Sequence, residues 1–74
     1  MTQLLEPYSV PFRDIQVGDL IPVNNGALWE ATVEPVETEP AEGEDIPRWQ
    51  VESASGVIST TFPDGPALVF RRHP

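Results

Sequence analysis

Nine prolines divide this 74-residue chain into short segments. A proline inside a helix removes a backbone hydrogen bond and clashes with the preceding turn. Only three proline-free stretches reach ten residues, and they cover 12–21, 23–34 and 48–62. Turn-forming pairs interrupt all three of them: Gly18-Asp19, Asn25-Gly26 and Ser55-Gly56. No segment has room for a helix of about three turns, so the sequence predicts an all-β fold.

Alternation of apolar and polar residues predicts where the strands lie. In the segment ALWEATVE, alternate residues of 29–33 are apolar, and Trp49 and Val51 alternate with polar neighbours in the same way. The five expected strands cover 19–23, 27–35, 46–53, 57–62 and 67–72. We expect residues 1–12 to form an N-terminal arm and residues 13–74 to form one domain, with both tryptophans turned inward.

Burial assigns a register to the first hairpin. A two-residue turn at Asn25-Gly26 would place the apolar Ile21 beside the charge of Glu30. A three-residue loop at 24–26 that ends in a left-handed glycine instead places Ile21 opposite Trp29. Because a slip of one residue moves every side chain to the other face, burial favours the three-residue loop.

Two further hairpins follow from the same assignment of faces. One loop is expected to be centred near Pro40, and one turn is expected to run through residues 53–56. Both place buried-face residues opposite each other, and the expected pairs are Ala31–Trp49, Trp29–Val51, Val51–Ile58 and Trp49–Thr60. Residues 63–66 are then expected to make a tight corner before the last strand.

The segment Ile15-Gln16-Val17-Gly18-Asp19-Leu20-Ile21, followed by an Asn-Gly turn and by WEATV, resembles the opening of SH3-like small barrels. Those proteins show a Val-Gly-Asp motif, an apolar strand, a glycine turn and a longer strand. The resemblance covers most of residues 12–72 and implies a single five-stranded antiparallel barrel with an acidic loop between strands 2 and 3. The chain departs from this pattern in the length of that loop and in Pro22, which indicates an edge position for its strand.

The net charge of −8 is concentrated in the run EPVETEPAEGED at 34–45, which holds six carboxylates and no base. The other 62 residues together carry only −2. The main interpretation of this run is a solvated connection between two strands, stiffened by proline and kept soluble by charge. All four basic residues are arginine, and this usage, with abundant Pro, Ala, Gly and Val, resembles that of GC-rich sources such as actinobacteria and their phages.

Most catalytic and metal-binding chemistries lack the residues that they need. The chain has no cysteine and no lysine, and its single histidine, His73, is the penultimate residue. Asp14 and Asp19 are one carboxylate pair near in sequence, but an aspartate after Gly18 more commonly caps its turn. The acidic run lacks the alternating pattern of a calcium loop. We therefore expect no enzyme activity, no cofactor and no dedicated metal site.

Direct nucleic-acid binding and membrane insertion are also disfavoured. Four basic residues against twelve acidic ones are a poor match for phosphates. No apolar run approaches the ~20 residues of a membrane span, and the N-terminal sequence lacks the basic flank and apolar core of a secretion signal. The expected location is the cytoplasm, or the host cytoplasm or virion if a phage is the source.

A non-catalytic protein-interaction module remains as the leading hypothesis, either for a protein partner or for self-association, as in a phage structural or accessory protein. Its candidate contacts lie outside the expected core, and they are Tyr8, Phe12, Leu28, Glu37, Glu39, Glu42, Glu44 and Asp45. For Tyr8 and Phe12 the alternative is that the arm packs over one end of the barrel. The alternative function is an acidic inhibitor whose carboxylates imitate nucleic-acid phosphates and block a DNA-handling protein.

Overall fold

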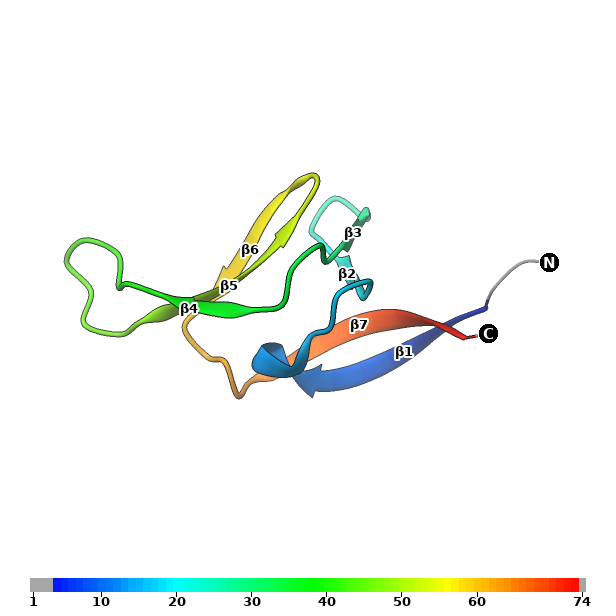
Figure 1. Ribbon diagram of the computed structural model, residues 1–74, viewed down its shortest axis with the longest axis horizontal. Helices are drawn as coiled ribbons and strands as arrows, with labels where there is room; N and C mark the ends of the chain where they lie inside the picture. Colours follow the sequence, from blue (N-terminus) through cyan, green and yellow to red (C-terminus); the bar gives the residue numbers. More distant parts are fainter. Residues whose placement is uncertain (1–3, 74) are drawn as a thin grey trace.

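The structure, a computed structural model, describes residues 4–73 and contains seven strands and one 3-10 turn in that range (Figure 1). The strands are β1 (Leu4–Pro11), β2 (Leu20–Pro22), β3 (Leu28–Glu30), β4 (Val36–Thr38), β5 (Arg48–Ser53), β6 (Gly56–Thr60) and β7 (Pro66–His73), and the turn is η1 (Phe12–Asp14). The all-β prediction is confirmed. The predicted closed barrel of five strands is wrong, because the strands form two antiparallel sheets with the orders β1-β7-β2-β3 and β4-β5-β6.

The two ends of the chain form the longest strand pair of the described residues. β1 pairs with β7 over eight residues, from Leu4 opposite His73 to Pro11 opposite Pro66. Within the segment 1–12 that is expected to be an arm, residues 4–11 form an edge strand of the larger sheet. Proline is compatible with an edge strand wherever its missing N–H would face away from the neighbouring strand.

Two of the predicted hairpins have the predicted register. Ile21 lies opposite Trp29, and Gly26 has a φ of +84°, the left-handed conformation expected at the end of the loop. The smaller sheet also contains the two predicted pairs Val51–Ile58 and Trp49–Thr60. The predicted corner before β7 is closed by the Gly65 N–H, which donates to the Phe62 carbonyl at 3.0 Å.

The hairpin between the acidic run and β5 differs from the prediction. Its register sets Glu37 opposite Trp49, so the loop is centred near Gly43 and not near Pro40. Gly43 has a φ of +83°. Glycine adopts this left-handed conformation without the steric cost of a Cβ, so Gly43 favours a hairpin whose tip lies at this position. The predicted pairs Ala31–Trp49 and Trp29–Val51 are therefore wrong.

The two sheets meet where the predicted strand 27–35 breaks. Ala31 forms a bridge with Ser53, and the Thr32 N–H donates to the Glu52 carbonyl at 2.8 Å. The chain then leaves the ladder and pairs with β5 again only at β4. One expected strand is thus divided between two sheets, and the expected barrel does not close.

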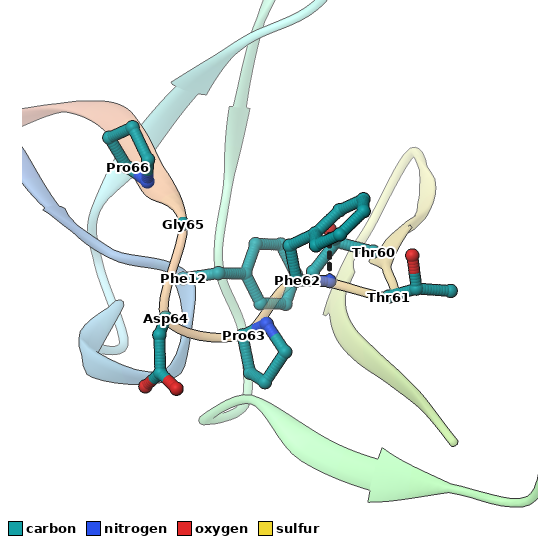
Figure 2. A pocket seen from close by; sticks show the side chains of 8 residues that line it. All are labelled: Phe12, Thr60, Thr61, Phe62, Pro63, Asp64, Gly65 and Pro66. Atoms are coloured by element: carbon teal, nitrogen blue, oxygen red, sulfur yellow. Dashed lines mark hydrogen bonds between the residues drawn. The ribbon is translucent and has the colours of Figure 1, made fainter. Parts of the chain in front are cut away.

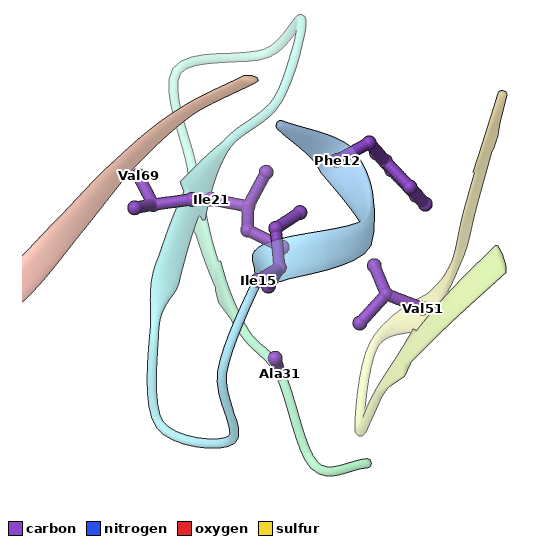
Figure 3. Packing of buried hydrophobic residues seen from close by; sticks show 6 residues of the cluster. All are labelled: Phe12, Ile15, Ile21, Ala31, Val51 and Val69. Atoms are coloured by element: carbon purple, nitrogen blue, oxygen red, sulfur yellow. The ribbon is translucent and has the colours of Figure 1, made fainter. Parts of the chain in front are cut away.

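The core lies between the two sheets (Figure 3). Its buried apolar side chains are Phe12, Ile15, Ile21, Ala31, Val51 and Val69. Trp49 packs against this cluster, and Trp29 is half buried with its ring over Gly56. The molecule is 49 Å long and 22 by 20 Å across, with the acidic loop at one end and the paired ends of β1 and β7 at the other (Figure 1).

Candidate protein-interaction surface

The four-stranded sheet has one face toward the core and one face toward solvent. Val69 of β7 and Ile21 of β2 are buried on the inner face. Their neighbours along each strand belong to the opposite face, because side chains alternate across a strand. A row of paired residues on this outer face crosses all four strands, through Pro7, Phe70, Leu20 and Glu30.

Apolar side chains dominate the outer face. Three leucines on three different strands are exposed: Leu5 of β1 at 42%, Leu28 of β3 at 44% and Leu68 of β7 at 49%. An ion pair borders them, in which Arg72 Nη2 lies 2.6 Å from Glu30 Oε1. The outer face is therefore an apolar surface with a charged pair along its margin.

The structure separates the three apolar residues that the sequence offers as contacts. Leu28 lies on the outer face, as alternation along its strand predicts. Phe12 is only 6% exposed and belongs to the core, because η1 turns its ring inward (Figure 3). Tyr8 shares the inner side of β1, where the Arg71 guanidinium lies 5.2 Å from its ring centroid. The Tyr8 hydroxyl donates to Glu6 at 3.0 Å, and this hydrogen bond to a carboxylate raises the pKa of Tyr8 above its ordinary value.

The acidic run 34–45 covers β4 and the loop after it, and this loop lies at the end of the molecule opposite the chain termini (Figure 1). All six carboxylates of this segment are exposed: Glu34 before β4, Glu37 within it, and Glu39, Glu42, Glu44 and Asp45 in the loop. Glu44 Oε1 accepts a hydrogen bond from Arg48 Nη2 at 2.8 Å. Within residues 4–73, no group of three or more acidic or histidine side chains is placed to hold a metal ion. The segment is a projecting, negatively charged loop.

A pocket of 740 Å³ lies at the corner before β7, lined by Phe12 and residues 60–66 (Figure 2). Phe62 lines it and is nevertheless 73% exposed. Arg13 Nε pairs with Asp64 Oδ1 at 2.8 Å, which ties η1 to this corner. Phe62 is not among the candidate contacts expected from the sequence. Its position directly before the corner 63–66 is the feature of the sequence that indicates an unpaired residue after the end of β6.

Asp19 holds a turn and a strand together. Its carboxylate accepts the Gln16 N–H at 2.9 Å, which caps the turn, and two nitrogens of Arg71 at 2.9 and 3.2 Å. None of these contacts involves Asp14. The side chain of His73 lies outside the described part of the structure.

Comparisons with known protein families, with curated proteins and with solved structures find no match to this chain. No helix in the range 4–73 is long and apolar enough to cross a membrane.

Proposed function

We propose that this chain is a small, non-catalytic protein-interaction module that holds a protein partner on the outer face of its four-stranded sheet. The observation that carries this proposal is the exposure of Leu5, Leu28 and Leu68 on one face. Monomeric proteins seldom leave a contiguous apolar patch in water, and an apolar centre with a polar margin is typical of protein interfaces.

The partner that fits this face is a complementary apolar surface with few charges at its centre. Charged residues are depleted from the centre of interfaces, whereas a marginal pair such as Arg72–Glu30 remains solvated. The leucines stand on paired strands and not on loops. Binding would therefore order little additional backbone, which lowers the entropic cost of association.

Leu28→Ser and Leu68→Ser test this proposal, with Val36→Ser as the matched control. Val36 is 49% exposed, as Leu68 is, but it lies in β4 of the smaller sheet. Substitutions at such exposed sites should change the free energy of unfolding by about 0.5 kcal/mol or less. We expect the two leucine variants to lose the partner that the tagged wild-type chain captures from its source organism, and Val36→Ser to retain it. Equal capture by all four proteins would reject the outer face.

The acidic loop favours a second candidate function, an inhibitor that imitates nucleic-acid phosphates and occupies a basic groove of a DNA-handling protein. Its carboxylates are exposed at one end of a molecule 49 Å long. Charge complementarity would give fast, salt-sensitive association. Replacing the six acids of 34–45 with Gln or Asn should abolish this binding and leave capture through the outer face intact. Unchanged affinity at low salt would exclude the inhibitor.

A further inference from the structure

Four strands of the described structure lie at a sheet edge: β1 and β3 in the larger sheet, and β4 and β6 in the smaller one. β3 is only three residues long, and the residue that follows it, Ala31, forms a bridge with Ser53 of β5. An unpaired edge presents N–H and C=O groups that another strand can bond, and proteins protect such edges with proline, charge or short length. The edges at β1, β4 and β6 differ in this protection.

β1 is protected by proline. The Phe12 N–H donates to the Gly65 carbonyl at 3.1 Å, so the even-numbered positions of this segment are bonded toward β7. The odd-numbered residues of β1 therefore direct their backbone groups outward, and they are Leu5, Pro7, Ser9 and Pro11. Two of these four have no N–H to offer, so β1 is a poor template for another strand.

β4 is protected by its length and by charge. It has only three residues, and the central one is Glu37. Pro35 and Pro40 stand on either side of the strand, and Glu34 and Glu39 add negative charge beside it. A strand added at this edge would meet all three carboxylates.

β6 has none of these protections. It lies in the run 53–62, ten residues without a charge or a proline in a chain of net charge −8. The two-residue loop Ala54-Ser55 makes Ser53–Gly56 a bonded pair, and alternation then directs the backbone groups of Val57 and Ser59 away from β5. Val57 is 53% exposed. An uncharged edge strand rich in β-branched residues is a good template for strand pairing.

We propose that β6 pairs antiparallel with β6 of a second copy of this chain, about a two-fold axis at Ile58. In this register Val57 of each copy faces Ser59 of the other. The outward N–H and C=O groups of these residues then form four backbone hydrogen bonds, and Ile58 lies opposite its own equivalent. The two three-stranded sheets become one six-stranded sheet, and the open β6 edge of each copy is covered.

Charge is compatible with this dimer even though each copy carries −8. The acidic strand β4 lies two strands away from β6 in its sheet. Five strand spacings, about 24 Å in total, therefore separate the two β4 strands of the dimer. This distance exceeds the Debye length of about 8 Å at physiological salt. The acidic loops thus repel each other only weakly. The run 53–62 contains no charged residue, so no like charges face each other at the seam.

A seam formed by one five-residue strand per copy is small beside the ~1,200 Å² that specific interfaces bury. The dimer should therefore form reversibly and at high protein concentration. It uses the smaller sheet and leaves the outer face of the larger sheet free, so it stands apart from the proposed function. A dimer would present two outer faces and would bind a repetitive partner with avidity.

Light scattering coupled to size-exclusion chromatography tests the dimer over a concentration series. We expect the mass to rise from 8.2 kDa toward twice that value as concentration increases. Ser59→Pro removes one outward N–H from each copy without touching a bond to β5, and Ser59→Thr is its control. Losing two backbone hydrogen bonds per dimer should weaken association about 30-fold, whereas Ser59→Thr should leave it unchanged. A mass of 8.2 kDa at every concentration would overturn the proposal.

A second experiment tests the register of the β6 pair with charged side chains, and it is informative even if Ser59→Pro distorts the strand. One variant carries Val57→Lys and Ser59→Lys, and the other carries Val57→Glu and Ser59→Glu. Because position 57 faces position 59 across the axis, each variant alone should be monomeric and an equimolar mixture should form a mixed dimer. Absence of the mixed dimer would overturn the β6 seam. A dimer that resists these changes but is lost with Leu68→Ser would also overturn it, while leaving the proposed outer face intact.

Discussion

Arg71 and Asp19 form a two-point ion pair that fastens β7 to the turn in front of β2. Arg71 Nε and Nη2 lie 2.9 and 3.2 Å from the two carboxylate oxygens of Asp19, whose side chain is only 4% exposed. The same carboxylate accepts the Gln16 N–H, so one residue caps a turn and joins segments 52 positions apart. The hydrogen bond to Asp19 raises the pKa of Arg71, and the guanidinium keeps its charge throughout the ordinary pH range.

We expect Asp19→Asn to be strongly destabilising, because it leaves the Arg71 charge without its anionic partner. Because the Arg71 side chain is 27% exposed and keeps part of its hydration, the cost should be about 1–3 kcal/mol, a large share of the ~3–5 kcal/mol that a core of this size supplies. The exposed pair Arg72–Glu30 offers the control, since Glu30→Gln should cost only about 0–1 kcal/mol. Urea unfolding followed by tryptophan fluorescence measures both variants. Equal midpoints for the two would show that burial of Asp19 adds nothing to its ion pair.

Tyr8 should titrate above the ordinary tyrosine pKa of about 10. Its hydrogen bond to Glu6, and then the charge of Glu6, raises the pKa of Tyr8, while Arg71 acts in the opposite direction. A raised pKa favours the neutral phenol, so this contact stabilises the fold below about pH 10 and is lost as the pH rises through the folded pKa. Tyr8 is the single tyrosine, so phenolate absorbance reports it directly. Glu6→Gln should lower the midpoint toward the value in urea, and an unchanged midpoint would contradict the contact.

Turn chemistry makes part of this fold predictable. The Ile21–Trp29 register follows from the left-handed Gly26, because a turn type and a buried face together determine strand pairing. The β5–β6 register follows from its two-residue turn in the same way. β1 is not predictable by this reasoning. Pro7 and Pro11 interrupt its pattern, and its pairing with β7 joins the two ends of the chain, which no local pattern encodes.

The residues of the candidate surface are likewise predictable only where local patterns identify them. Alternation within one hairpin separates two faces, and this alone identifies Leu28 as an outer residue. Leu5 and Leu68 come to lie on the same face only through the pairing of β1 with β7, so no local pattern in the sequence identifies them as part of the surface. Phe12 shows the opposite error. The sequence predicts an arm for the segment that contains Phe12, whereas the geometry of η1 turns the Phe12 ring into the core.

The ring of Trp29 occupies the space that a side chain at position 56 would need. A Cβ added at Gly56 would lie 2.9 Å from Trp29 Cη2 and 3.0 Å from Cζ3, closer than two carbons approach without repulsion. Gly56→Ala should therefore lower the free energy of unfolding by about 1–3 kcal/mol. Trp29→Phe makes room, so the double variant should be more stable than the sum of the single effects implies. Urea unfolding of the four proteins, followed by circular dichroism, measures this coupling, and strictly additive effects would exclude the contact.

Val51 and Val69 come from different sheets but share one core, so the two sheets should unfold together. Both side chains are buried, at 1% and 0% exposure. Val51→Ala should lower the free energy of unfolding by about 1.5–3 kcal/mol through lost burial and the cavity left behind, and Val57→Ala, at an exposed site of the same sheet, by less than about 0.5 kcal/mol. Native-state hydrogen exchange is the decisive measurement, because cooperative unfolding transmits the loss to amides of β7 that Val51 does not contact. Faster exchange in β5 alone would mean that the sheets are separate folding units, and that the outer face rests on the pairing of its own four strands.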